Sequence, residues 1–191
     1  MLGFAYLLWA VHELAARGNR VELELVGDGP ERGALSQLAQ QLGIAQQIRW
    51  RGWVPFAQVR EAMLDATILV HPSEGLGDGL PNVLREAMAL GTPVIASRVA
   101  GIPEALNEGQ CGVLVPPRDV PALADAIAAL LADPDRRRLF ADRGRAWTEA
   151  QFDTWRNGAR LAEALRATAR GQHSPARSPS VTEPAVEIPT W

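Results

Sequence analysis

Apolar and polar residues along this chain follow two periods. Apolar residues recur at helical spacing over residues 4–17, 31–42, 58–66, 82–90, 102–106, 120–131 and 155–169, and another helix opens at 134. Short apolar runs at 21–26, 47–51, 68–70, 94–96 and 112–115 predict five strands. Because the helices alternate with the strands, the order indicates an α/β fold with a doubly wound parallel sheet.

Residues 70–104 form the most informative unit. The strand at 68–70 stops at Pro72 and gives way to a loop that contains Gly75, Gly77 and Gly79. Glycines let the backbone turn tightly and approach a ligand closely. A helix then opens near Pro81, which suits a first helical position because proline lacks the N–H that is not needed there. This strand, glycine loop, helix and strand predict a parallel βαβ crossover.

The junction of loop and helix carries the candidate chemistry. The first helical turn leaves the N–H groups of Asn82 and Val83 without intrahelical partners, at the positive end of the helix dipole. Such an end binds phosphate. Asp78 and Glu86 frame the site, and because acids repel phosphate, we expect them to bind hydroxyls. A sugar nucleotide offers both a diphosphate and hydroxyls.

The sequence Asp78-Gly-Leu-Pro-Asn-Val-Leu-Arg-Glu86-Ala-Met-Ala resembles the acidic-x7-Glu donor-site motif of retaining family 4 glycosyltransferases. In that family the motif lies in the C-terminal domain of the two-domain GT-B fold. The resemblance runs over about residues 3–155 and includes the turn at 25–30, the segment 52–54 and the approach at 71–73. It implies a Rossmann-like half of a GT-B fold.

The resemblance also implies roles for the two acids. Glu86 would hold the ribose hydroxyls, and Asp78 would face the hexose and the diphosphate as the catalytic-site acid. The family often has Glu at the first position, and Asp is one methylene shorter with the same charge. Glu74 is a rival for this role, but its spacing to Glu86 is four residues too long. The alternative interpretation is a loop whose solvated acids cap a helix.

Further substrate contacts are assigned to the backbone of Gly79, Leu80, Asn82 and Val83 and to the segment after the second strand. In the resembling family the nucleotide base rests on that segment, here Trp53 and Val54. Trp53 either stacks on the base or fills the space between strand and helix. Asp28, which lies between two glycines, has two interpretations as well: a ribose ligand, or a turn former that needs no ligand.

Composition narrows the function classes. The chain has 191 residues, 47% of them apolar, and a formal net charge of −3, which gives no reason to expect nucleic-acid binding. The single Cys111 excludes an internal disulfide and a cysteine-based metal site, and the three histidines have no metal-ligand spacing. We expect no metal and no cofactor. No stretch reaches the roughly 20 apolar residues of a membrane span, and we expect a cytoplasmic protein.

Three parts of the resembling fold are missing. The chain opens on a helix, so the first central strand is absent, together with the Gly-Arg and Lys that follow it and neutralise the donor diphosphate. The N-terminal acceptor domain is absent too. In the strand order 3-2-1-4-5-6 the lost strand is central. We expect the gap to close by direct pairing of the strands at 21–26 and 67–70, or the domain to be poorly stable.

The expected organisation is a donor-binding Rossmann-like domain at 1–155, a C-terminal helix at 156–170 and a disordered Pro- and Ser-rich tail at 171–191. We interpret the chain as a glycosyltransferase domain that binds a nucleoside-diphosphate sugar for retaining hexose transfer, a fragment inactive alone. The alternative is a non-catalytic sugar-nucleotide-binding or interaction module that pairs with a separate acceptor domain. An NAD-dependent oxidoreductase is weakly supported, because no Gly-x-Gly-x-x-Gly follows the first strand.

Overall fold

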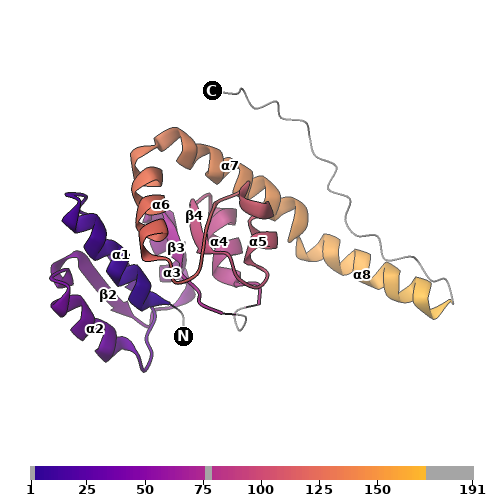
Figure 1. Ribbon diagram of the computed structural model, residues 1–191. Coiled ribbons are helices and arrows are strands. Elements are labelled where there is room, and N and C mark those ends of the chain that lie inside the picture. The colour runs from indigo at the N-terminus through magenta and orange to yellow at the C-terminus, as the bar shows by residue number, and fades with distance from the viewer. Residues whose placement is uncertain (1–2, 76–78, 171–191) are drawn as a thin grey trace. The chain divides into compact units, whose positions relative to one another are not determined.

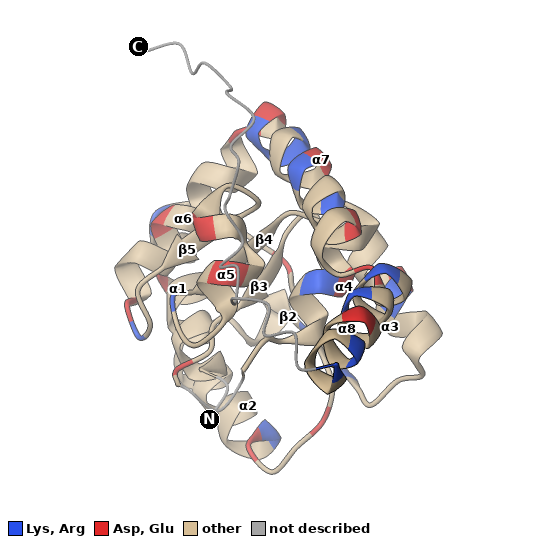
Figure 2. Ribbon diagram, turned by 90° about the vertical axis from the view of Figure 1, so that its right-hand side faces the viewer, with Lys and Arg blue, Asp and Glu red and all other residues tan. Residues whose placement is uncertain are grey.

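The computed structural model describes residues 3–75 and 79–170, and the chain divides into two compact units, Met1–Phe152 and Asp153–Trp191. The first unit alternates helices with strands (Figure 1, and Figure 2 turned by 90°). Its elements are α1 (Phe4–Ala16), β1 (Leu23–Val26), α2 (Arg32–Gln41), η1 (Ala45–Gln47), β2 (Ile48–Gly52), α3 (Phe56–Asp65), β3 (Leu69–His71), α4 (Asn82–Leu90), β4 (Val94–Ser97), α5 (Ile102–Ala105), η3 (Asn107–Gly109), β5 (Val113–Val115), α6 (Val120–Ala132) and α7 (Pro134–Gln151).

The predicted order of helices and strands is confirmed, and local signals explain several of their ends. Asp119 caps α6 by accepting the N–H of Ala122 at 2.9 Å, and Gly91 ends α4 in the left-handed conformation at φ 81°. Pro81 is placed differently from the prediction. It precedes α4 as the N-cap residue, with an extended ψ of 126°, so the helix begins at Asn82.

All strand pairs in the described part of the chain are parallel, which confirms the parallel α/β fold, but they form two sheets. One sheet has the order β1-β2 and the other β3-β4-β5. The expectation that the gap closes by direct pairing of β1 with β3 is therefore wrong. The reason lies in the packing, because residues of both sheets contact one apolar core built on α1 and α6. This shared core fixes the spacing of the two sheets.

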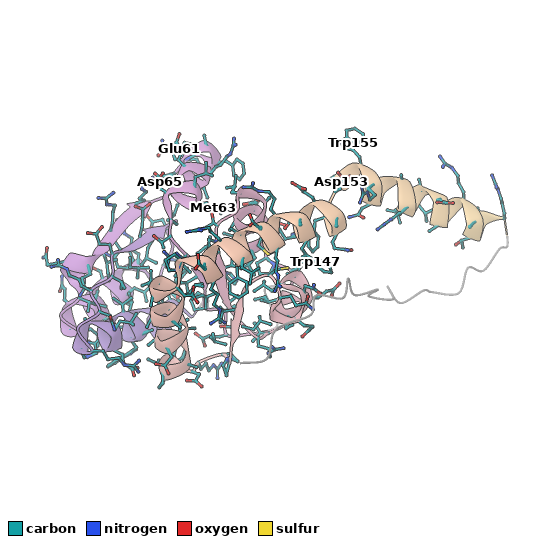
Figure 3. All side chains as sticks on the ribbon, turned by 90° about the horizontal axis from the view of Figure 1, so that it is seen from above. Glu61, Met63, Asp65, Trp147, Asp153 and Trp155 are labelled. Carbon is teal, nitrogen blue, oxygen red and sulfur yellow. The ribbon has the colours of Figure 1, made fainter. Side chains whose placement is uncertain are left out.

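The larger sheet separates two apolar cores. Along β4, Ile95 belongs to the core of α1 and α6, whereas Val94 and Ala96 belong to a second core built from α3, α4 and α5. This alternation is the period of two that a strand imposes. Met63 of α3 points into the second core (Figure 3), with 5% of its surface exposed. Helices thus cover both faces of the β3-β4-β5 sheet.

The two strands that border the gap, β1 and β3, are less buried than β4. Every residue of β4 is buried, those of β3 are half-buried, and in β1 burial falls from half-buried to exposed at Val26, which is 37% exposed. Strands of parallel sheets are normally buried on both faces. The facing edges of β1 and β3 are therefore the least protected part of the fold, and poor stability stays a prediction.

The second unit contains α8 (Thr154–Ala169), described here by itself. Asp153 caps it by accepting the N–H of Arg156 at 2.6 Å. The helix buries no residue, and its large apolar side chains are exposed, with Trp155 at 90%, Leu161 at 61% and Leu165 at 62%. Trp155 projects away from the helix in Figure 3. The predicted tail at 171–191 lies outside the described residues.

Candidate functional site

The carboxyl edge of the β3-β4-β5 sheet gathers the ends of two helices. Ligands of open parallel sheets bind outside the carboxyl ends of the strands, and α4 starts from the loop that leaves β3 at this edge. The start of α1 lies here as well. Gly3, at φ 69°, packs so closely that a Cβ on it would lie 1.7 Å from the Pro72 carbonyl oxygen, so only glycine fits. The positive ends of two helix dipoles therefore lie near the end of β3.

The loop before α4 is fixed to the start of α5. The carbonyl of Gly79, which has a φ of 52°, accepts the N–H of Gly101 at 3.0 Å. The half-buried Leu80 and Val83 pack against the core of α3, α4 and α5. No side chain caps α4 in the residues that the structure describes. The backbone at Gly79, Leu80, Asn82 and Val83 is thus held at the edge of the sheet by packing behind it.

Glu86 lies on the same face of α4 as Asn82, which precedes it by one turn. Both line a hollow of about 240 Å³, whose lining is Asn82, Arg85, Glu86, Ala89, Thr148 and Phe152. Glu86 is the fifth residue of the helix, so it lies just over one turn from the helix start. Asp78, the other predicted acid, lies outside the described residues.

Sequence reasoning missed the wall of this hollow that comes from the end of α7. The guanidinium of Arg85 is hydrogen-bonded to Asn82 Oδ1 and lies 5.1 Å from the centre of the Phe152 ring, within cation–π range. Arg85 Nε and Thr148 Oγ1 are buried without a hydrogen-bond partner in the described part of the chain. The spacing i, i+3, i+4 and i+7 of the α4 residues would have identified the face, but nothing local identified Phe152.

Trp53 is exposed to 79% on the loop after β2, and Phe56, at the start of α3, is exposed to 66%. Of the two interpretations of Trp53, filling the space between strand and helix does not describe this arrangement. Val54 is half-buried beside it. The structure thus leaves one aromatic face open at the carboxyl end of β2, and stacking on a base stays a prediction.

Asp28 needs no ligand to account for its position. Its carboxylate accepts the N–H of Gly29 at 2.8 Å and a hydrogen bond from Arg32 at 2.7 Å. The backbone hydrogen bond, followed by the guanidinium, lowers the pKa of Asp28 below its ordinary value. The turn-forming interpretation therefore explains this residue.

The family of the chain follows from its sequence match. Residues 2–133 match the family model described as "Glycosyl transferases group 1". The chain belongs to this glycosyltransferase family. It is 36% identical over 167 residues to the GDP-mannose-dependent alpha-(1-6)-phosphatidylinositol monomannoside mannosyltransferase of Mycolicibacterium smegmatis. This match covers 83% of this chain and 43% of that protein.

Solved glycosyltransferase structures share the fold. Sucrose-phosphate synthase from Thermosynechococcus elongatus has a TM-score of 0.77 at 30% identity, over 89% of this chain and 43% of that one. Anabaena HepE in complex with UDP has a TM-score of 0.74 at 25% identity, over 83% of this chain and 44% of that one. The chain spans less than half the length of these relatives.

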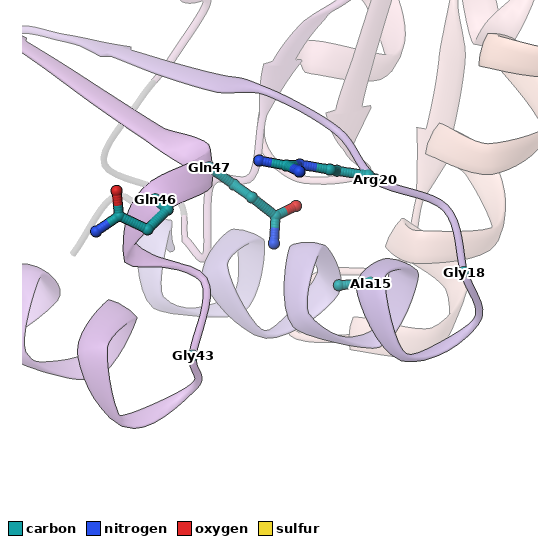
Figure 4. Close-up of a pocket in the computed structure, with 6 residues that line it drawn as sticks. All are labelled: Ala15, Gly18, Arg20, Gly43, Gln46 and Gln47. Carbon is teal, nitrogen blue, oxygen red and sulfur yellow. The ribbon is translucent and has the colours of Figure 1, made fainter.

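This glycosyltransferase domain has a second hollow, but it lies elsewhere. Figure 4 shows it, about 320 Å³ in volume and lined by Ala15, Gly18, Arg20, Gly43, Gln46 and Gln47. Arg20 precedes β1 and Gln47 precedes β2, so this hollow is at the amino ends of the strands, away from the edge that carries Glu86.

Other chemistry is limited in residues 3–75 and 79–170. They contain no group of three His, Cys, Asp or Glu side chains that could hold a metal ion, and none of their helices is long and apolar enough to cross a membrane. Cys111 is buried to 3% exposure, and desolvation raises the pKa of its thiol to about 11. It is a core residue and not an activated nucleophile.

Proposed function

We propose that this domain binds the nucleoside-diphosphate sugar of a retaining glycosyltransferase. The observation that carries the proposal is the position of Glu86, just over one turn into the helix that opens at the carboxyl edge of the sheet, inside a hollow shared with Asn82. A carboxylate at this depth reaches the hydroxyls of a ribose whose diphosphate lies at the helix start. Family membership supports this geometry.

The proposed ligand class also draws on the relatives. HepE was crystallised with UDP, and the name of the Mycolicibacterium relative includes GDP-mannose. The two have a nucleoside diphosphate in common and differ in the base. We therefore assign the diphosphate to the backbone of Gly79, Leu80, Asn82 and Val83, and the base to the exposed Trp53 with Val54. Neither the base nor the sugar is specified.

Hexose transfer also requires a domain that holds the acceptor. In the proposed mechanism Glu86 binds the ribose and Asp78 orients the hexose, while the acceptor is held by an N-terminal acceptor domain that these residues do not include. Bringing both reactants together in the correct geometry can supply about 7–11 kcal/mol of a barrier. A donor-binding domain alone loses most of this contribution to lowering the barrier. This chain therefore binds the donor without transferring its sugar at a useful rate. We place the protein in the cytoplasm.

The test is a titration of UDP and of GDP into the parent chain, Glu86→Gln and a control, Glu61→Gln. Glu61 is an exposed glutamate of α3 (Figure 3) outside the hollow. Loss of a hydrogen bond to a charged group costs about 1.5–3 kcal/mol, which is roughly 10–150-fold in affinity. We expect that loss for Glu86→Gln with the tighter-binding nucleotide, and no change for Glu61→Gln. Equal affinities for Glu86→Gln and parent would remove Glu86 from the site.

A further inference from the structure

One ion pair joins two of the loops at the carboxyl edge. Arg118, which follows β5, places its Nε 3.3 Å from Oε2 of Glu74, which follows β3. The Glu74 side chain is 14% exposed and the Arg118 side chain 63%. Such a pair links the segments that follow the two outer strands of one sheet.

Glu74 also lies against the start of α1. Its γ-carbon is 3.3 Å from the position that a Cβ on Gly3 would take, and Gly3 precedes the first residue of the helix. The Glu74 side chain thus packs against the residue that precedes α1, near the positive end of the helix dipole, and its carboxylate is paired with a guanidinium. This arrangement shows that the edge accommodates a negative charge by means of Arg118 and the helix terminus together.

The backbone of Arg118 is unusual in a way that glycine would avoid. Its φ is 63°, a left-handed conformation that non-glycine residues seldom adopt and that glycine adopts without a steric penalty. The chain nevertheless has arginine here, with most of its side chain accessible. Backbone strain of this kind clusters at ligand-binding sites.

The other arginines near this edge are engaged elsewhere. Arg85 is held by Asn82 and Phe152, and Arg98, after β4, pairs with Glu108 at 3.2 Å. Arg118 is the one whose present partner lies beside a helix N-terminus at the end of β3. Its guanidinium presents several donors in a fixed fork that matches a phosphate.

We propose that Arg118 supplies the charged side-chain contact to the donor diphosphate, beside the backbone N–H groups at the start of α4, and that Glu74 holds its guanidinium in place until the donor arrives. This assignment rests on the proposed function. The guanidinium exchanges the Glu74 carboxylate for phosphate oxygens, and no covalent step is involved. The assignment also removes Glu74 from the candidates for the hexose-facing acid, because its role is to pair with Arg118.

Arg118→Gly is the sharpest variant, because it removes the guanidinium while suiting the backbone conformation. Nucleoside diphosphate (UDP and GDP) and the corresponding nucleoside are titrated into the parent, Arg118→Gly and Glu74→Gln. Arg138→Ala serves as the control, since Arg138 is an exposed arginine of α7 paired with Asp135 at 3.5 Å. Thermal unfolding of each variant is recorded alongside.

We expect Arg118→Gly to bind the diphosphate about 10–150-fold more weakly, the effect of losing one charged hydrogen-bonding partner. Its affinity for the nucleoside and its unfolding temperature should stay at the parent value. Glu74→Gln should bind the diphosphate more tightly than the parent, because it frees the guanidinium and removes a negative charge. Arg138→Ala should match the parent in every measurement.

Parent-like diphosphate binding by Arg118→Gly overturns the assignment. So does an equal loss for diphosphate and nucleoside accompanied by a lower unfolding temperature, which would give Arg118 a structural role. Absence of any nucleotide binding by the parent chain instead overturns the proposed function itself. The two failures are therefore distinguishable in one set of titrations.

Discussion

Two adjacent amides on β3 should exchange their hydrogens at very different rates. Leu69 donates its N–H to the Pro93 carbonyl at 2.8 Å, so its amide points at β4. Because alternate residues of a strand direct their backbone groups to opposite neighbours, Val70 directs its N–H and C=O towards β1. In the described part of the chain, β3 forms no pair on that side. We expect Val70 to exchange much faster than Leu69.

The size of the difference follows from the opening free energy of the protected amide. Exchange slows tenfold for every 1.4 kcal/mol needed to open the hydrogen bond. The β3-β4 pair includes the buried residues of β4, so its bonds should open only with the domain. Even at the lower limit of domain stability, about 5 kcal/mol, Leu69 should exchange more than about 1000-fold slower than an unbonded amide.

The perturbation is a strand-forming segment of alternating valine and threonine, added before Met1. A parallel strand placed between β1 and β3 would run towards the carboxyl edge, where α1 begins beside Pro72, so a short linker suffices. Exchange of Leu69 and Val70 is followed by NMR in D2O, together with the urea midpoint. We expect the added strand to slow Val70 towards the rate of Leu69 and to raise the midpoint.

The same segment with proline at alternate positions serves as the control, since proline cannot donate to a neighbouring strand. It should leave Val70 fast and the midpoint unchanged. Equal exchange of Leu69 and Val70 in the unextended chain, whether both are slow or both fast, would refute the reasoning. Both slow would mean that the gap is paired, and both fast would mean that β3 and β4 are not stably joined.

Three further predictions concern the site and the core. In a full-length chain that includes an acceptor domain, Asp78→Asn should impair sugar transfer while Glu74→Gln should not; the opposite ranking would show that Glu74 is the hexose-facing acid. The 191-residue chain should release no nucleoside diphosphate from UDP- or GDP-sugars above a Glu86→Gln control; turnover above it would mean that this half is an enzyme in its own right. Cys111, whose thiol has its pKa raised from 9.0 to about 11, should resist iodoacetamide at pH 8 until urea is added, and its contribution to stability should be lost as pH rises from about 9 towards 11; rapid labelling of the folded chain would contradict its burial.

The helices and strands were predictable because each carries its own signal. Apolar spacing marks α1 and α6, and glycine ends α4. Asp119 caps α6 because its side chain accepts one of the N–H groups of the first helical turn. Their ends were less certain, as Pro81 shows. Its fixed φ suits both the first helical position and the residue before it, so only ψ separates the two.

The site was only partly predictable, because its walls come from distant segments. The spacing from Asp78 to Glu86 is local and can be seen in the sequence. The contact of Arg85 with Phe152 and the pairing of Arg118 with Glu74 depend on how α4 meets α7 and how β5 lies beside β4. No periodicity records such contacts. Arg118 in particular follows two prolines in a loop, where a sequence pattern gives no reason to single it out.

Of the two expectations for the gap, direct pairing was wrong because backbone pairing was weighed without the core. Leu23 and Leu25 of β1 and Val70 of β3 contact the same apolar core as Leu8 of α1. Fully burying a large aliphatic side chain contributes about 1.5–3 kcal/mol. These half-buried side chains each contribute less than that, which is comparable with the roughly 0.5–1.5 kcal/mol net of one hydrogen bond, and there are several of them. Pairing β1 directly with β3 would displace several such side chains for a few hydrogen bonds. The core therefore keeps the sheets apart.

Helix α1 connects the gap between the two sheets to the carboxyl edge of the β3-β4-β5 sheet. The body of α1 packs against both sheets, and its first turn lies against Pro72 and Glu74 at the carboxyl edge. A strand that occupied the gap would run parallel to its neighbours and end at this edge, beside the starts of α1 and α4. Completing the sheet would therefore also fix the helix ends at the edge where the diphosphate is proposed to bind. It follows that an added strand should tighten nucleotide binding as well as stabilise the fold, and that the proline control should do neither.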